Sequence, residues 1–327
     1  MPKVAVLDDW QGVAKTSADW SKLMSRAEVV FFDTAFENED DAAAKLADFD
    51  IVLSMRERTP LPASLINRLP KLRMLGMTGA RNASLDTAAC TARGVAVCST
   101  QGGGSNESAT AELALGLLIA AARGLAVGDA SIRSGRFQEG VPIGIGLAGK
   151  TLGIIGLGRL GSHMARYGRA LNMNLLAWSQ NLTPEKAQAA GAALVSKEEL
   201  LSRSDAVSIH LVLSDRTRCL IGPADIARMK PGAILVNTSR GPIVDEKALI
   251  EAVQARRIIA ALDVFNREPL PADHPLRTAP NAVMTPHLGY CVQETWEQFY
   301  PQSLENALAF LEGEPVRVVN PEALRKA

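Results

Sequence analysis

The fold of this chain is decided by the stretch Gly156-Leu157-Gly158-Arg159-Leu160-Gly161. It follows an apolar run, residues 151–155, that is typical of a β-strand, and it precedes a run with helical periodicity, residues 162–171. A strand, a glycine-rich turn and a helix in this order are typical of a dinucleotide-binding βαβ unit. About 150 residues come before this stretch, so we predict that the nucleotide-binding unit is inserted into another domain.

Each glycine of this turn has a separate physical role. Gly156 permits the tight turn, Gly158 lets the backbone approach the pyrophosphate, and Gly161 allows the helix to pack closely on the strand. Because the helix begins here, its first N–H groups and its positive dipole end face the phosphates. We therefore expect the amides of Arg159 and Leu160 to bind the pyrophosphate. A GxGxxG pattern alone would be weak, but the strand and helix around it make a purely structural turn the minority interpretation.

The composition is that of an ordinary globular protein with two domains. The chain has 327 residues, which is too long for a single typical core. Apolar residues make up 47% and charged residues 21%, which excludes the composition of a disordered chain. Lysine plus arginine and aspartate plus glutamate balance at 35 each, so neither nucleic acid nor an anionic membrane is expected as a partner.

The cysteine pattern indicates a reducing compartment and no metal site. The four cysteines, at positions 90, 98, 219 and 291, form no CxxC pair and match no zinc spacing, so we expect free thiols. Residues 1–8 lack the long apolar core of a signal peptide, and the longest apolar stretch, residues 113–122, is too short to span a bilayer. The sequence therefore predicts a soluble, cytoplasmic protein with no membrane partner.

Short β-branched runs alternate with helical runs along the whole chain, which is typical of a parallel α/β architecture. Strands are predicted before the glycine stretch at residues 3–7, 28–32, 51–54, 72–76 and 95–98. Six more are predicted, as a complete dinucleotide-binding domain requires, at residues 151–155, 174–178, 206–210, 233–237, 258–263 and 282–285. Long helices are expected at residues 106–123 and 292–311, and residues 126–149 are expected to form an extended loop or an oligomer arm.

The predicted fold class is α/β, with two doubly wound parallel-sheet domains. A Rossmann cofactor domain, residues 106–290, is predicted to be inserted into a split, flavodoxin-like substrate domain, residues 1–105 and 291–327. The segment Gln-Gly-Gly-Gly-Ser, residues 101–105, interrupts the α/β pattern and marks the first boundary. The last long helix is expected to pack back on the first domain.

The residues after the second predicted strand of the cofactor domain leave the choice between NAD and NADP open. An acidic residue is expected about 20 residues after the glycines, where it would bind the ribose 2′-hydroxyl of NAD. This chain has Ser179 there, followed by Gln180 and Asn181. No carboxylate at these positions repels the 2′-phosphate of NADP, and no arginine attracts it. Lys186, the nearest cation, is predicted on the following helix.

Three residues with catalytic chemistry follow three predicted strands of the cofactor domain. Arg240, Glu268 and His287 each come just after the carboxyl end of a strand, and ligands of open α/β sheets bind at this edge. A guanidinium binds a carboxylate through two hydrogen bonds, and a histidine exchanges protons near neutral pH. Alone, each residue is as well explained by an ion pair, a turn or a structural histidine. Together, behind a nucleotide-binding turn, they indicate an active site.

Four segments, in order and with matching spacing, give this chain a resemblance to a known family. They are the glycine stretch 156–161, the NTSRG segment 237–241, the DVFNREP segment 263–269 and the PHLG segment 286–289. With them the chain resembles the D-isomer-specific 2-hydroxyacid dehydrogenases, which include phosphoglycerate dehydrogenases and glyoxylate/hydroxypyruvate reductases. The resemblance covers nearly the whole chain. It implies an enzyme that transfers a hydride between NAD(P)H and a 2-keto acid, forming a D-2-hydroxy acid.

The resemblance also implies a role for each site residue. Arg240 would bind the substrate carboxylate and polarise the keto group, and His287 would be the general acid/base. Glu268 would pair with His287 and favour the imidazolium. Asp263 would contact the carboxamide side of the nicotinamide. The other residues that the resemblance places at the cofactor are Thr78, Thr110, Leu211, Thr238, Ser239 and Gly289.

In the first domain, the resemblance implies a loop that binds the substrate carboxylate through backbone N–H groups. Gly79 and Ala80 lie in this loop, and Arg56, after the third strand, is expected to line the cleft. The family pattern is nearer to Gly-x-Gly-x-Asp-Asn, from which Ala80 and Arg81 depart. A homodimer is also implied, with residues 126–149 among the candidate contacts.

Two alternative functions share this architecture. A phosphite-type dehydrogenase would have the same arginine, glutamate and histidine, whereas a formate dehydrogenase typically has glutamine in place of Glu268. A non-enzymatic, NAD(H)-sensing corepressor-like protein would also keep these residues. Such a protein would be expected to have a peptide-binding groove and disordered extensions, and this chain has no long tail after its last helix.

Overall fold

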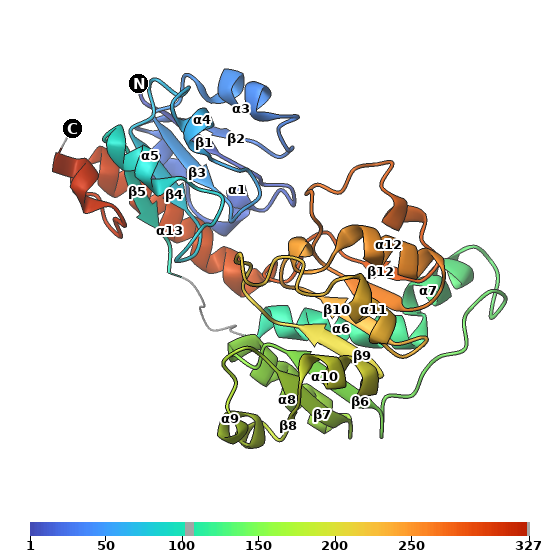
Figure 1. Cartoon of the computed structure of the whole chain (residues 1–327). Coiled ribbons are helices and arrows are strands. Elements are labelled where there is room, and N and C mark those ends of the chain that lie inside the picture. The colour runs from blue at the N-terminus through green and yellow to red at the C-terminus, as the bar shows by residue number, and fades with distance from the viewer. Residues whose placement is uncertain (102–107, 326–327) are drawn as a thin grey trace. The chain divides into compact units, whose positions relative to one another are not determined.

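A computed structural model describes residues 1–101 and 108–325 of the chain. The chain divides into two compact units (Figure 1). Unit 1 contains Met1–Asn106 and Val292–Ala327, and unit 2 contains Glu107–Cys291. Each unit holds one fully parallel sheet, so the predicted α/β fold class is confirmed. The predicted first boundary, at residues 105 and 106, lies outside the described residues.

Unit 1 is built on a five-stranded sheet with the order β2-β1-β3-β4-β5, which is the order of a flavodoxin-like fold. Strands β3 and β4 are buried at every position, as expected for a parallel sheet with both faces covered. The register places Leu53 beside both Val6 and Gly76. The strands are β1 (Lys3–Val6), β2 (Glu28–Phe31), β3 (Ile51–Ser54), β4 (Met74–Met77) and β5 (Ala96–Ser99).

The last part of the chain completes unit 1. Helix α13 (Gln293–Leu311) packs against β4 and β5. Val319 donates its N–H to the carbonyl of Val97, whose own N–H donates to Asn320 Oδ1 at 2.7 Å. Unit 1 is therefore assembled from two separate segments of the chain. Its other helices are α1 (Ala14–Ser17), α2 (Ser21–Met24), α3 (Glu39–Leu46), α4 (Ala63–Ile66), α5 (Thr87–Ala92) and η3 (Pro321–Arg325).

Unit 2 is built on a seven-stranded sheet with the order β12-β11-β10-β9-β6-β7-β8. The strand order reverses between β6 and β9, which are neighbours in the sheet. The sequence predicted six of these strands but not β8, whose two residues are too few to show a hydrophobic period. The strands are β6 (Thr151–Ile155), β7 (Asn174–Trp178), β8 (Ala193–Leu194), β9 (Ala206–Ile209), β10 (Ile234–Asn237), β11 (Ile259–Leu262) and β12 (Ala282–Met284).

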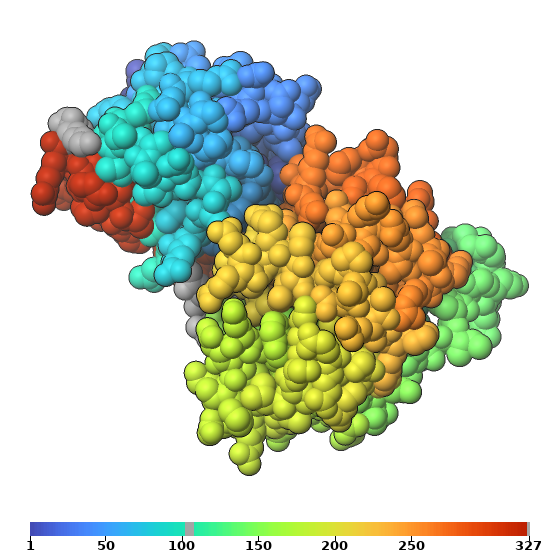
Figure 2. Space-filling model, viewed as in Figure 1, coloured from blue at the N-terminus to red at the C-terminus, as the bar shows by residue number. Residues whose placement is uncertain are grey.

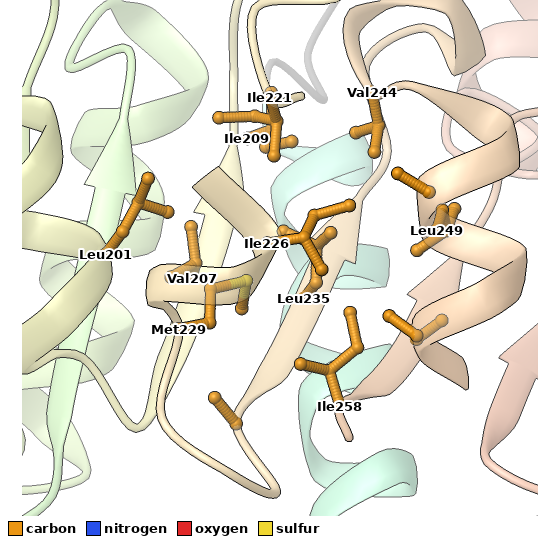
Figure 3. Packing of buried hydrophobic residues seen from close by; sticks show 14 of the residues in the cluster. Leu201, Val207, Ile209, Ile221, Ile226, Met229, Leu235, Val244, Leu249 and Ile258 are labelled. Carbon is orange, nitrogen blue, oxygen red and sulfur yellow. The ribbon is translucent and has the colours of Figure 1, made fainter. Parts of the chain in front are cut away.

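A hydrophobic core covers one face of this sheet. It holds in place the strands whose carboxyl ends are followed by the predicted site residues. Figure 3 shows Ile226, Leu235, Leu249 and Ile258 packed together between helices and sheet, and each is at most 5% exposed. Burying a side chain of this size contributes about 1.5–3 kcal/mol. The helices of this unit that follow the glycine turn are α8 (Arg159–Ala170), α9 (Pro184–Ala189), α10 (Lys197–Arg203), α11 (Pro223–Arg228), η1 (Gly241–Ile243), α12 (Glu246–Gln254) and η2 (Pro275–Thr278).

The start of unit 2 holds a helix that the sequence did not predict. Helix α6 (Ala109–Arg123) ends at Gly124, whose φ of +61° is the left-handed conformation of a helix C-terminus. Helix α7 (Leu125–Arg133) follows, where an extended loop was expected, because Gly128 and several exposed apolar residues mask its periodicity. Among the described residues, no single helix is long and apolar enough to cross a membrane; α6 and α7 meet that criterion only together, and they are bent by 66°.

Candidate functional site

The glycine turn between β6 and α8 is shaped by close packing at two of its three glycines. A Cβ at Gly161 would lie 2.0 Å from the carbonyl oxygen of Gly156. Gly156 itself has a φ of +96°, and a Cβ there would lie 2.5 Å from the carbonyl oxygen of His210. At Gly158, by contrast, a Cβ would meet no atom within 4 Å. Because Gly158 is the N-cap of α8, this open space lies beside the helix N-terminus, as a bound pyrophosphate requires.

Two buried polar atoms at the carboxyl ends of neighbouring strands of this sheet have no hydrogen-bond partner among the described residues. They are Thr238 Oγ1, after β10, and His210 Nδ1, after β9. Burial lowers the pKa of His210 to about 4, so its ring is neutral near pH 7, and its Nε2 contacts Ser208 Oγ at 2.8 Å. A buried polar atom without a partner is costly, and a ligand that bonds to it removes that cost. The residues at this sheet edge therefore fit a nucleotide.

Other predicted cofactor residues lie around the same turn. Leu211 is adjacent to it, since a Cβ at Gly156 would lie 2.8 Å from Leu211 Cδ2. Ser179 is half-buried at the end of β7, and Gln180 and Asn181 are exposed. Lys186 lies on α9, as predicted. Residues 179–181 thus bring neither a carboxylate nor a cation to the ribose end of this site.

The predicted catalytic glutamate and histidine are in direct contact. His287 Nδ1 lies 2.5 Å from Glu268 Oε2, and the second oxygen of Glu268 accepts a hydrogen bond from the N–H of Phe265 at 2.8 Å. His287 has a φ of +55°, a conformation that residues other than glycine adopt rarely. Because Nδ1 faces Glu268, Nε2 is the ring nitrogen that can exchange a proton with a substrate. Tyr290 packs edge-on against this imidazole, with 5.7 Å between ring centroids.

Asp263 holds the backbone of the histidine loop. Its Oδ1 accepts hydrogen bonds from Thr285 Oγ1 at 2.6 Å and from the Leu288 N–H at 2.7 Å, and its Oδ2 accepts one from the Gly289 N–H at 2.8 Å. Its carbonyl accepts a further bond from the N–H of His287. Burial raises the pKa of Asp263 above its ordinary value, and the hydrogen bonds from these donors only partly oppose that rise. Sequence reasoning expected a nicotinamide contact and did not find this positioning role.

Arg240 is brought beside the glutamate segment by a glycine that sequence reasoning did not single out. A Cβ at Gly241 would lie 2.2 Å from the carbonyl carbon of Phe265, so only glycine lets the two backbones approach this closely. Arg240 Nη1 donates to the carbonyl of Ser239, and its own carbonyl accepts a bond from Asn237 Nδ2. Ser239 Oγ donates to a β9 carbonyl, which ties the segment to the sheet.

Thr110 and Gly289 are also neighbours, as expected if both lie at the cofactor. Thr110 Oγ1 donates to the carbonyl of Gly289 at 2.9 Å. A Cβ at Gly289 would lie 3.0 Å from Thr110 and 3.2 Å from Asp263, which leaves little room for a larger residue. The start of α6 is therefore fixed to the loop that carries His287.

The predicted substrate-binding residues of unit 1 form a separate group after β3 and β4. Arg56 has a φ of +49° and donates from Nη1 to the carbonyl of Thr78 at 3.1 Å. Gly79 has a φ of +81°, and its N–H donates to Thr100 Oγ1 at 2.8 Å. Ala80 is exposed. Because the Gly79 amide already has a partner, the amides of the next residues are better candidates for binding a carboxylate.

Comparisons with known proteins identify the family. The sequence model for the D-isomer specific 2-hydroxyacid dehydrogenase NAD-binding domain matches residues 115–289. Glyoxylate reductase from Aeropyrum pernix is 39% identical over 274 residues, covering 81% of each chain. The crystal structure of a putative D-3-phosphoglycerate dehydrogenase from Ralstonia solanacearum superposes with a TM-score of 0.90 at 38% identity, covering 99% of this chain and 98% of that one. The chain belongs to the D-isomer-specific 2-hydroxyacid dehydrogenase family.

The matched region coincides with most of unit 2, which is therefore the nicotinamide-cofactor-binding part of the chain. D-3-phosphoglycerate dehydrogenase from Archaeoglobus fulgidus is 38% identical over 264 residues, which cover 80% of this chain but 50% of that protein. The chain thus spans about half the length of some curated relatives that it matches.

Proposed function

We propose that this chain is a nicotinamide-dependent oxidoreductase that interconverts 2-keto acids and D-2-hydroxy acids. The observation that carries the proposal is the 2.5 Å contact between His287 Nδ1 and Glu268 Oε2 in a chain of this family. The pair lies at the carboxyl ends of strands in the sheet that also bears the glycine turn. The group that exchanges the proton and the turn that binds the hydride-carrying cofactor therefore lie at the same edge of one sheet.

The roles of the protein groups follow from their chemistry. Arg240 binds the substrate carboxylate, because its planar guanidinium matches two carboxylate oxygens. His287 Nε2 gives a proton to the carbonyl oxygen during reduction and takes it back during oxidation. Glu268 fixes the ring through Nδ1 and stabilises its cationic form. The nicotinamide, when bound, supplies or accepts the hydride.

Initial rates with NADH and NADPH against glyoxylate, hydroxypyruvate, pyruvate and bulkier 2-keto acids test this proposal. Turnover of at least one acid is expected. Both cofactors are part of the proposal, because residues 179–181 neither repel nor attract a 2′-phosphate. Tight cofactor binding without turnover of any acid would instead support a corepressor-like sensor. Reduction of NAD(P) by phosphite alone would support a phosphite-type dehydrogenase.

Two glycine substitutions separate cofactor binding from folding. Gly158→Ala should weaken NADH binding at least tenfold and leave the melting temperature of the cofactor-free protein unchanged, because its Cβ would enter open space where the pyrophosphate is expected. Gly161→Ala should lower the melting temperature by several degrees, because its Cβ would clash with the carbonyl of Gly156. Fluorescence titration and thermal melting measure the two effects. Equal NADH affinity in Gly158→Ala and wild type would contradict the proposed phosphate site.

We also propose a homodimer formed through α7 and the segment after it. Figure 2 shows this part of the chain, in green, protruding at one edge of unit 2. Leu125, Ile132, Phe137 and Ile143 are exposed, Phe137 by 71% and Ile143 by 99%, and apolar residues this exposed on one segment indicate an interface. A Phe137→Glu/Ile143→Glu variant should become monomeric in sedimentation or light scattering. A monomeric wild-type protein would refute the proposal. We also propose a cytoplasmic location, because the structure leaves the four cysteines as free thiols.

A further inference from the structure

One buried side chain spans the short loop that carries Arg240. Asn237 is the last residue of β10 and is 1% exposed. Its Nδ2 donates to the carbonyl of Arg240 at 3.0 Å, and its Oδ1 accepts a hydrogen bond from the N–H of Ser239 at 3.0 Å. Residues 238–240 are all that separates β10 from η1, so this side chain bonds to the backbone of two of the three residues in the loop.

The surroundings of the Asn237 side chain require an amide. The N–H of Ser239 can only donate and the carbonyl of Arg240 can only accept, so these two groups decide which way the amide points. A carboxylate would place a second acceptor against the carbonyl of Arg240, and an alanine would bond to neither group. Asp263 is the opposite case, because three donors surround its side chain and only a carboxylate accepts from all of them.

The backbone of Asn237 is fixed on both sides by the sheet. Its carbonyl accepts a hydrogen bond from the N–H of Asp263 at 3.0 Å, and the register pairs it with residues of both β9 and β11. The carbonyl of Arg240 also accepts a bond from the N–H of Ile243, at the longer distance of 3.3 Å. Asn237 is therefore a rigid point of attachment from which the Arg240 loop is held.

We propose that Asn237 is a positioning residue, whose amide holds the backbone of Arg240 so that the guanidinium meets the substrate carboxylate. Asn237 acts through Arg240 and not on the substrate. A planar guanidinium binds a carboxylate through two hydrogen bonds only in the correct orientation, so a displaced backbone weakens this contact. The inference rests on the proposed function, in which Arg240 binds that carboxylate.

The variant Asn237→Asp removes one of the two hydrogen bonds. The introduced carboxylate can still accept from the N–H of Ser239, but its second oxygen would face the carbonyl of Arg240. At pH 8, we expect the KM for glyoxylate to rise and kcat/KM to fall about 10- to 100-fold. NADH affinity should stay within about threefold of wild type, because the bond to Ser239 and the glycine turn are kept. Steady-state rates and fluorescence titration measure these effects.

Acid should rescue Asn237→Asp, because a protonated carboxyl group has one donor beside a remaining acceptor and so mimics the amide. Burial and the facing carbonyl oxygen both oppose the charged form, which raises the pKa of the introduced carboxyl group. The ratio of kcat/KM in the variant to that in wild type should therefore rise about fivefold or more from pH 8 to pH 6. Both proteins share the other ionisable groups near this position, which are Glu246, Asp263 and the Glu268–His287 pair, and Arg240 stays charged throughout.

Asn320→Asp provides the matched control. Asn320 is also 1% exposed, and its amide also bonds to a backbone N–H, of Val97, and to a backbone carbonyl, of Val95. It lies in unit 1, and these partners are not predicted site residues. Asn320→Asp should lower the melting temperature as Asn237→Asp does, but it should leave the KM for glyoxylate within about twofold of wild type.

Asn237→Ala tests the inference even where Asn237→Asp does not fold, because it introduces no charge. It should lower kcat/KM for glyoxylate about tenfold or more, without rescue by acid. A rise in KM no larger for the two Asn237 variants than for Asn320→Asp would overturn the positioning role, and so would a ratio for folded Asn237→Asp that does not change with pH. Failure of the wild type to reduce any 2-keto acid would instead overturn the proposed function, and this inference with it.

Discussion

Replacing His287 with glutamine should lower kcat for glyoxylate reduction by about 100- to 10,000-fold, the usual contribution of a general acid. Glutamine is uncharged and cannot deliver a proton at the position of Nε2. The contact with Glu268 indicates that the native ring is held for this task. Steady-state rates measure the loss, and fluorescence titration should show NADH affinity within about threefold of wild type, because the glycine turn is untouched.

A second histidine provides the matched control for this prediction. His163 lies on α8 of the same unit, and its Nδ1 contacts Arg166 at 2.8 Å. His163→Gln should leave kcat within about twofold of wild type. If His287→Gln kept more than a tenth of the wild-type rate while folded and bound to NADH, another group would have to be the proton donor.

Asp263→Asn should lower both the rate and the stability. The asparagine side chain would present an NH2 group to at least one of three donors that now reach the carboxylate, namely Thr285 Oγ1 and the N–H groups of Leu288 and Gly289. A buried donor facing another donor costs about 1–3 kcal/mol, and more where a charged acceptor is lost. We expect a fall of several degrees in melting temperature and a fall of about 100-fold in kcat, because the His287 loop loses its support.

The split between kinetic constants distinguishes positioning from simple loss of fold. If Asp263 positions the histidine loop, kcat should fall far more than the KM for the keto acid changes, measured well below the melting temperature. Exposed Asp273, in the same unit, gives the control, and Asp273→Asn should be silent in both assays. A destabilised Asp263→Asn with unchanged kcat would limit Asp263 to a structural role.

The strands and the glycine turn could be predicted from sequence because they depend on local patterns. Buried parallel strands are short apolar runs, and the turn needs glycine at fixed positions: a Cβ at Gly161 would meet the carbonyl of Gly156 at 2.0 Å. Helix α7 was missed because its apolar residues face outward and Gly128 interrupts it, so it lacks the period of a core helix. Strand β8 was missed because two residues carry no period.

The position of the candidate site could be predicted from the sequence. The hydrogen bonds and backbone contacts that hold its residues in place could not. Arg240, Glu268 and His287 each follow a strand, and strand ends are visible in the hydrophobic pattern. Asp263 and Gly241 position the site through contacts with backbone atoms about 25 residues further along the chain. Contacts over this separation leave no local pattern in the sequence. The roles assigned to the site residues stay predictions until the variants above are measured.

The hydrogen bond from Thr110 to Gly289 has a consequence for how the chain folds. Unit 1 closes only when Asn320 reaches Val97, a separation of 223 residues, and closing a flexible loop costs entropy that grows with its length. If unit 2 folds first, the hydrogen bond between Thr110 and Gly289 connects two residues that are 179 positions apart. The loop that remains to be closed between Val97 and Asn320 is then roughly 44 residues long. The shortening lowers the closure cost by about 1.4 kcal/mol, roughly tenfold in the equilibrium. The folded unit 2 therefore favours the assembly of unit 1, because it brings the two chain segments of unit 1 closer together.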